Sequence, residues 1–175
     1  MLKYSTILFF AFIEFYPYGV LSKPVDFVKK LREVGTLVTE IAEKLQEPPE
    51  SFERIGSKFY YIETIQKKNW FSARNTCRRM GGNLANIQNS EELIVIKRHA
   101  KINREEHYWL DITDLADEGQ FVSSTTGESA TFLKWAWTDP NNLNGVEDCV
   151  DLYRDLMQDD NCKAKKYYFI CEAGN

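Results

Sequence analysis

Acidic and amide side chains gather in three short runs near the C-terminal end of the sequence. The runs are Asp139-Pro140-Asn141-Asn142, Glu147-Asp148 and Gln158-Asp159-Asp160-Asn161. Their oxygens are hard ligands of the kind that Ca²⁺ prefers, since this ion binds about six to eight oxygens in proteins. The same composition is also typical of a solvated loop, and Asp-Pro-Asn by itself favours a turn. The residue types therefore indicate either a calcium site or plain turns.

Paired carboxylates can also hydrolyse glycosides, which requires one protonated carboxyl group as the acid. A calcium ion bound by the carboxylates of these runs would keep them ionised and would leave no proton donor. The two histidines do not stand at zinc-ligand spacing, and no Ser or Cys lies in a nucleophile motif. The sequence therefore predicts a binding protein without enzymatic activity.

Composition limits the class of protein further. The chain has 175 residues, of which 43% are hydrophobic, and its net charge is -4. This length favours one domain with accessory segments, and the apolar content suffices for a buried core. Nucleic acid is not an expected partner, because its backbone is held by clustered Lys and Arg. The short basic run Lys163, Lys165 and Lys166 is interpreted as a solvated face.

The first 22 residues have the pattern of a cleaved secretion signal. Lys3 precedes an apolar run from Ile7 to Phe15, and Val20 and Ser22 are small enough for a cleavage site. The run is too short to span a membrane, and no later segment is apolar for long enough. We therefore expect a signal peptide over 1-22, a secreted extracellular protein and no membrane insertion.

Secretion determines how the four cysteines are interpreted. They are Cys77, Cys149, Cys162 and Cys171, and none belongs to a C-x-x-C pair. In an oxidising compartment they are expected to form two disulfides rather than a metal cluster. The sequence alone allows three pairings. Spacing favours the local pair Cys149–Cys162, which leaves Cys77 to bond Cys171.

The segment 23-50 carries one apolar stripe with helical spacing. Its members alternate in steps of four and three, and they are Phe27, Leu31, Val34, Val38, Ile41 and Leu45. Pro48-Pro49 ends the pattern. One interpretation is an amphipathic helix packed on its own domain. The other is a coiled-coil neck, through which residues 23-47 form a homo-oligomer.

The segment 51-175 has a globular composition and contains both helix and strand patterns. Helices are expected over 69–80 and from a cap at Ser90, and strands over 59–62, 108–110, 149–152 and 167–171. The Ser-, Thr-, Asn- and Gly-rich region 123–144 predicts long loops. Helices followed by several strands indicate an α+β class.

Several motifs of this segment resemble those of the C-type lectin family, especially its insect secreted single-domain members. Gly81-Gly82-Asn83-Leu84-Ala85 is similar to the family's G-G-x-L-A, and Tyr108-Trp109-Leu110 is similar to its W-I-G-L strand. Trp135 and the spacing of the last three cysteines continue the match over Phe52 to Glu172. The resemblance implies a C-type lectin-like fold with two helices, two small antiparallel sheets and a long loop region. It also implies the bridges Cys77–Cys171 and Cys149–Cys162.

The resemblance also implies which residues hold calcium and sugar. Sugar-binding members use Glu-Pro-Asn, a Glu before the second cysteine and an Asn-Asp pair before the third. The matching residues here, expected to bind both Ca²⁺ and ligand around a cis proline, are Asp139, Asn141, Glu147, Gln158 and Asp159. Auxiliary metal ligands are implied at Asp114, Glu118, Asn142 and Asp148, where Asn142 replaces an Asp. Trp137 is a candidate for stacking on a sugar ring, although Trp residues more often pack in the core.

Two of these side chains depart from the family pattern. Asp139 is one methylene shorter than the usual Glu, and Gln158 is one longer than the usual Asn; Met157 replaces a Trp. Our hypothesis is that the first two changes compensate and leave a weakened but working site. The alternative is a decayed site on an intact fold.

The resulting prediction is a secreted calcium-dependent lectin. The order acid-Pro-amide favours mannose, fucose or N-acetylglucosamine and leaves galactose open. The expected partners are glycans or glycoproteins on cell or microbial surfaces, with innate immune recognition, agglutination or adhesion as roles by analogy. The alternative function is a calcium-independent protein-interaction module on the same fold.

Overall fold

The computed structural model describes residues 24–46 and 49–174. The chain divides into two compact units, Met1–Gln46 and Glu47–Asn175. The signal peptide expected over 1-22 lies outside the described residues. Among the helices that the structure describes, none is both long and apolar enough to cross a membrane.

The first unit contains the helix α1, Pro24–Gln46. It covers the apolar stripe expected from the sequence, with Asp26 in its first turn. The stripe is exposed in the single chain, from 67% at Phe27 to 49% at Ile41. An amphipathic helix with so much exposed apolar surface lacks the burial that normally stabilises such an element.

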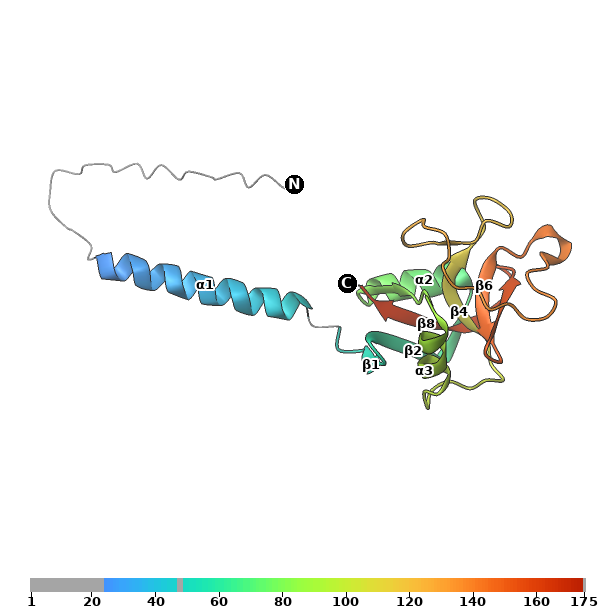
Figure 1. Ribbon diagram of the computed structural model, residues 1–175, viewed down its shortest axis with the longest axis horizontal. Coiled ribbons are helices and arrows are strands. Elements are labelled where there is room, and N and C mark those ends of the chain that lie inside the picture. The colour runs from blue at the N-terminus through green and yellow to red at the C-terminus, as the bar shows by residue number, and fades with distance from the viewer. Residues whose placement is uncertain (1–23, 47–48, 175) are drawn as a thin grey trace. The chain divides into compact units, whose positions relative to one another are not determined.

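The second unit contains two further helices and eight strands (Figure 1). The helices are α2, Trp70–Arg79, and α3, Ser90–Lys97, and a short 3-10 helix covers Leu143–Gly145. The strands are β1 Glu53–Ile55, β2 Lys58–Lys68, β3 Gly82–Leu84, β4 Tyr108–Thr113, β5 Val122–Ser123, β6 Cys149–Tyr153, β7 Leu156–Asp160 and β8 Tyr167–Ala173.

Strand β8 joins the whole sheet together. It pairs antiparallel with β2 and β3 and parallel with β4, and the main strand order is β1-β2-β8-β4-β6-β7. The two small antiparallel sheets expected from the sequence are thus hydrogen-bonded into one mixed sheet. The α+β class is confirmed.

Local sequence explains where the two helices begin and end. The Asn69 carboxamide oxygen accepts the Ser72 N–H at 2.9 Å and caps α2, which satisfies a donor that the first turn leaves free. Helix α2 ends before Gly81, whose φ of +83° suits glycine. The cap of α3 was expected at Ser90, but Asn89 performs it, accepting the Glu92 N–H at 2.9 Å.

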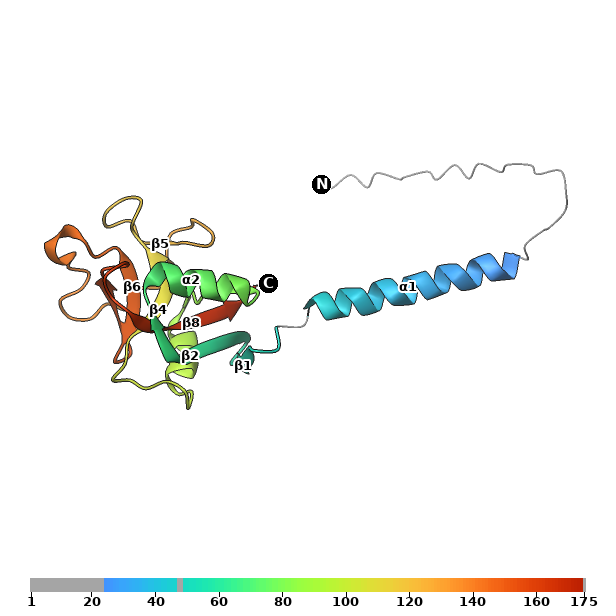
Figure 2. The same ribbon diagram turned by 180° about the vertical axis from the view of Figure 1, so that it is seen from behind.

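The two helices pack against different apolar clusters. Trp70, Ala73 and Cys77 of α2 belong to one, and Leu93 and Ile96 of α3 to the other. Figures 1 and 2 show the helices on opposite sides of β2 and β8. Two further contacts fix the first cluster, since the buried indoles of Trp70 and Trp109 donate to the carbonyls of Leu110 and Lys68 at 2.8 and 2.9 Å.

Glycine is required where β3 approaches β8. A Cβ atom on Gly82 would lie 2.3 Å from the Glu172 carbonyl oxygen and 2.8 Å from Cζ of Phe52. The backbone contact explains the second glycine of the Gly81-Gly82 pair, because only a residue without a side chain allows this strand pairing.

Both disulfides expected from the sequence are present. Cys77–Cys171 joins α2 to β8 across 94 residues, and Cys149–Cys162 joins β6 to the segment after β7 across 13. The long bridge ties the helical layer to the central strand. The short bridge joins the end of the acidic run Glu147-Asp148 to the end of the run 158–161.

Removing the long bridge should cost more stability than removing the short one. Replacing both Cys77 and Cys171 by Ala should lower the free energy of unfolding by about 4.6 kcal/mol, against about 3 kcal/mol for Cys149 and Cys162, because closing the longer loop removes more entropy from the unfolded chain. Urea unfolding of the two double variants measures both values. A smaller loss for the Cys77–Cys171 variant would contradict this expectation.

Candidate functional site

The hairpin of β6 and β7 forms the base of the acidic region. Val150 pairs with Asp159 and Asp151 with Gln158, and the turn residues Arg154 and Asp155 both have positive φ, as a two-residue hairpin turn demands. The sequence did not predict β7, because the run Gln158 to Asn161 has the composition of a loop. The strand holds Gln158 and Asp159 at fixed positions beside the loop 138–147.

These elements enclose an open hollow of about 290 Å³. All five residues expected to bind calcium and sugar line it, so the structure brings them together from a loop and a strand. The lining residues are His107, Thr138, Asp139, Asn141, Leu143, Glu147, Gln158, Asp159, Asp160, Lys165 and Tyr167.

Asp159 holds the loop against the strand. It is 4% exposed, and its carboxylate accepts the Asn141 N–H at 3.0 Å and the Asn142 N–H at 2.7 Å. Bonds to an ionised acceptor are about twice as strong as neutral ones. This interaction positions the backbone on either side of the Asn141 side chain.

The side chains of Asp139 and Glu147 are also hydrogen-bonded within the loop. The Asp139–Pro140 peptide bond is cis, and the Asp139 carboxylate accepts the Asn141 side-chain N–H at 3.1 Å and the Thr138 hydroxyl at 3.1 Å. Glu147, 9% exposed, accepts the Leu143 N–H at 2.9 Å. Each carboxylate keeps acceptor capacity, since it has about four lone-pair sites.

Crowding of negative charge changes how these carboxyls ionise. Burial raises the pKa of Glu147, and the nearby Asp160 and Asp159 raise it further. Burial also raises the pKa of Asp139, to which Asp159 adds. Four carboxylates line the hollow, and Lys165, 3.4 Å from Asp160, is the ammonium among its lining residues. A cation bound there would relieve the repulsion.

The donor set of the hollow fits calcium, although the side chains do not form a closed cage. In residues 24–46 and 49–174, no three His, Cys, Asp or Glu side chains are grouped closely enough to hold a metal ion as they stand. The three carboxylates and two amide oxygens that line the hollow are nevertheless all hard ligands. Small side-chain movements toward one point would be needed to complete a coordination shell.

The expected auxiliary ligands are linked by hydrogen bonds. Asn142 donates its side-chain N–H to Glu118 and accepts the Glu147 N–H at 3.1 Å. The Asp114 N–H donates to the Asp148 carbonyl at 3.2 Å, and the Asp114 Oδ1 is buried without a partner among the described atoms. An Asp in place of Asn142 would face Glu118 with a like charge, and a cation would be needed to offset the repulsion. The hydrogen bond from the Asn142 side chain to Glu118 avoids that repulsion without a cation.

The two tryptophans next to the loop have different surroundings. Trp135 is half-buried, and its ring lies 4.7 Å from that of Phe121. Trp137 is fully exposed and does not line the hollow. Met157, which stands where the family has a Trp, is buried, and its sulfur accepts the Lys134 N–H at 3.3 Å. The Met157 side chain therefore serves the core.

His107 was not expected at the hollow. Its ring stacks between Tyr153 and Tyr167, at 4.2 and 4.4 Å between centroids, and its Nδ1 lies 2.8 Å from the carboxylate of buried Asp151. Burial raises the pKa of Asp151 to about 6, and His107 opposes this rise. No motif signals this group, because its members come from three separate segments: His107, strand β6 with Asp151 and Tyr153, and strand β8 with Tyr167.

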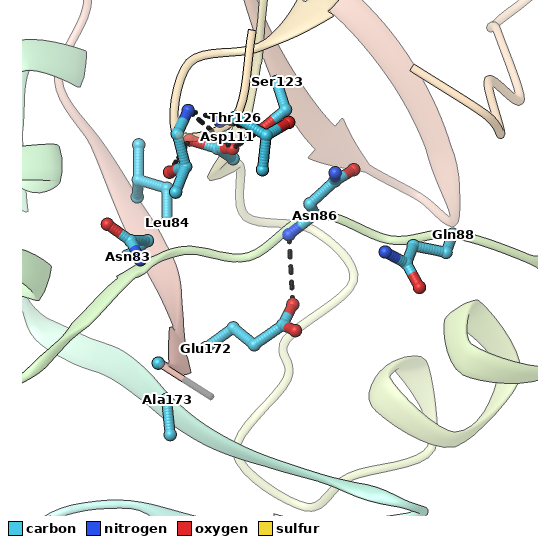
Figure 3. A pocket seen from close by; sticks show the side chains of 11 residues that line it. Asn83, Leu84, Asn86, Gln88, Asp111, Ser123, Thr126, Glu172 and Ala173 are labelled. Atoms are coloured by element: carbon cyan, nitrogen blue, oxygen red, sulfur yellow. Dashed lines mark hydrogen bonds between the residues drawn. The ribbon is translucent and has the colours of Figure 1, made fainter. Parts of the chain in front are cut away.

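A second hollow, of about 240 Å³, lies beside β3 and the end of β8. Figure 3 shows Glu172 accepting the Asn86 N–H and the buried Asp111 surrounded by hydroxyl donors. The Asp111 carboxylate accepts the hydroxyls of Ser123 and Ser124, and Glu172 forms an ion pair with Lys58 at 3.0 Å. Both carboxylates thus serve the fold, and no residue expected to bind metal or ligand lines this hollow.

Comparison with known proteins decides the family. The model of the lectin C-type domain matches residues 66–173. The chain belongs to the C-type lectin family. Several of its relatives are named as C-type lectins, which are binding proteins.

Two fruit-fly proteins are among the relatives of this C-type lectin. C-type lectin 37Db of Drosophila melanogaster is 43% identical over 57% of this chain and 64% of its own length. Accessory gland protein Acp29AB of the same species is 40% identical over 70% of this chain and 50% of its own length. The chain thus spans less than two thirds of these two relatives.

Solved structures agree on the fold. The carbohydrate-recognition domain of the mouse scavenger receptor C-type lectin superposes with a TM-score of 0.64 at 27% identity, over 72% of this chain and 97% of that one. A calcium-independent type II antifreeze protein, at 23% identity and a TM-score of 0.62 over 71% of this chain and 92% of its own, shares the fold alone. The fold by itself therefore does not establish calcium dependence.

Replacing Glu147 by Gln tests the electrostatic description of the hollow. In a chelator, the folded state binds a proton at Glu147 more tightly than the unfolded state, because its pKa lies above the usual 4.5. Stability from this group therefore falls as pH rises through the raised pKa. The wild type should lose stability relative to Glu147→Gln as the pH rises above 4.5, as measured by urea unfolding. A difference that stays constant or grows with pH would contradict this description.

Proposed function

We propose that this C-type lectin is a secreted, calcium-dependent carbohydrate-binding protein. The observation that carries the proposal is the hollow in which Asp139, Asn141, Glu147, Gln158 and Asp159 converge from a loop and a strand. Their oxygens match the ligand chemistry of Ca²⁺. The raised pKa values of Asp139 and Glu147 further indicate a site that favours a cation.

Calcium would supply coordination to two neighbouring sugar hydroxyls and would orient them. The protein's own side chains then complete the hydrogen bonds, since the carboxylates of Asp139 and Glu147 accept from hydroxyls and the amides of Asn141 and Gln158 donate to them. Single sites of this kind are weak, because water competes for the same bonds.

The two departures from the family pattern lie side by side. Gln158 is near enough to Asp139 for its amide to lower the pKa of that carboxyl against the larger effect of burial. Gln158 is one methylene longer than the usual Asn, and Asp139 is one shorter than the usual Glu. The summed length of the two side chains across the site is therefore unchanged, so the two changes compensate. This supports a working site of lowered calcium affinity rather than a decayed one.

The order of acid, proline and amide in Asp139-Pro140-Asn141 favours mannose, fucose or N-acetylglucosamine. Galactose is the second candidate, because the two altered side chains shift the hydrogen-bonding pattern. Trp137 is fully exposed and one residue from the lining residue Thr138. It offers an aromatic face to a sugar ring that extends beyond the hollow.

The proposed setting is extracellular. The signal pattern of residues 1-22 and the two disulfides suit an oxidising compartment. Relatives include proteins named as an accessory gland protein and a salivary C-type lectin. Glycans on cell or microbial surfaces are the proposed partners, in recognition, agglutination or adhesion.

A calcium-independent protein-interaction module is the second candidate function. The side chains of the hollow already hydrogen-bond one another, and no closed cage of acidic groups is present in the described residues. In this case the loop 138–147 would present a preformed surface without a cation. Binding that persists in chelator would favour this candidate.

A glycan array with calcium and with chelator tests the main proposal. Wild type should bind mannose-type glycans with calcium and lose binding in chelator. Glu147→Gln should weaken binding by roughly tenfold or more, since it removes a charged calcium ligand. Asp117→Asn, an exposed carboxylate changed in a nearby turn, is the matched control and should bind as wild type. Equal binding with and without calcium would refute calcium dependence.

We further propose that α1 links copies of the chain. Its exposed apolar stripe has heptad-like spacing, and a second copy of the helix would bury it. Linked copies would raise the avidity of weak sites by about 10²–10⁴. Sedimentation should show an oligomer for residues 23–175 and a monomer for residues 51–175. If both proteins sediment as monomers, α1 does not form a coiled-coil neck.

A further inference from the structure

A basic groove lies beside helix α2 and includes Lys166 of the short basic run. Its volume is about 540 Å³, within the range of ligand sites. Every lining residue is polar, four are cationic and none is acidic among those that the structure describes. The basic groove is formed by Lys67, Lys68, Asn69, Ser72, Asn75, Thr76, Arg79 and Lys166.

Its cations are held in place by neighbouring groups. The Lys67 ammonium lies 4.9 Å from the centroid of the Tyr168 ring, and that of Lys68 lies 5.6 Å from the Phe169 ring. Lys68 also donates to the Thr76 hydroxyl at 2.9 Å. Contacts of this kind reduce the entropy that a side chain loses when it binds a ligand.

Acidic side chains of the protein neutralise the basic groove only in part. Glu106 forms an ion pair with Lys67. In the described part of the chain, Lys68, Arg79 and Lys166 form no ion pair with a carboxylate. The groove therefore concentrates positive charge in a chain whose net charge is -4, and it favours anionic ligands.

The basic groove lies next to the hollow proposed for sugar. Lys165 and Tyr167 line the hollow, whereas Lys166 between them lines the groove. Lys67 of the groove pairs with Glu106, the neighbour of the hollow residue His107. A single glycan chain could therefore contact both surfaces.

We infer that the basic groove binds acidic glycans, with sulfate or carboxylate groups on Arg79, Lys166 and Lys68. The amides of Asn69 and Asn75 and the hydroxyl of Ser72 suit the sugar hydroxyls between those charges. Binding in the groove needs no calcium. The choice of a glycan over another polyanion rests on the proposed function of the neighbouring hollow, whereas the preference for anions does not.

The test measures binding of a sulfated heparin hexasaccharide in chelator, at about 50 and 200 mM salt. Wild type should bind at low salt and weaken at high salt, and the desulfated hexasaccharide should not bind. The double variant Arg79→Gln/Lys166→Gln should bind roughly tenfold more weakly, with a smaller salt dependence. Arg54→Gln/Arg98→Gln removes the same charge from exposed positions on β1 and after α3, and it should match wild type.

Three results would overturn the inference. They are no binding by wild type, an equal loss in the control variant, and tighter binding of a single-stranded DNA oligonucleotide than of the sulfated glycan. A parallel arm with calcium and a neutral mannose-type glycan keeps the two proposals apart. If wild type fails to bind only the neutral sugar, the calcium site is refuted and anion binding in the basic groove is not. If it fails to bind only heparin, the basic groove is refuted and the calcium site is not.

Discussion

The carboxylate of Asp159 is the interaction on which the site depends. It is nearly buried and accepts backbone N–H groups from both Asn141 and Asn142. A buried charge without such donors would cost several kcal/mol. These bonds therefore fix the loop 138–147 to β7 and hold Asp139 and Glu147 at the same hollow.

The same arrangement leaves the hollow with more carboxylates than cationic side chains. Satisfying Asp159 with backbone donors leaves it close to the neighbouring carboxyls. Burial raises the pKa of Glu147 and of Asp139, and the nearby carboxylates raise both further. The loop is thus stable enough to stay in place, yet electrostatically it favours a cation. At Asn142 the repulsion is avoided instead, since the amide bonds Glu118 directly.

Local sequence patterns predicted the helices and favoured the two bridges, and the resemblance to the family implied five of the residues that line the hollow. Trp70, Ala73 and Cys77 repeat with helical spacing, and the spacing of the four cysteines favours their pairing. Strand β7 was missed, since Gln158 to Asp160 is polar and acquires strand geometry only by pairing with β6. The basic groove was missed for a related reason, because Lys67, Arg79 and Lys166 meet only in the folded chain.

Charge is thus divided between two neighbouring surfaces, an acidic hollow and the basic groove, separated by the segment 165–167. The direct test of the central claim is a crystal structure of the lectin unit grown with millimolar calcium. We predict one ion in the hollow, with oxygens of Asp139, Glu147 and Asp159 at about 2.3–2.6 Å. A hollow without an ion, whose side chains keep their present hydrogen bonds, would contradict the account.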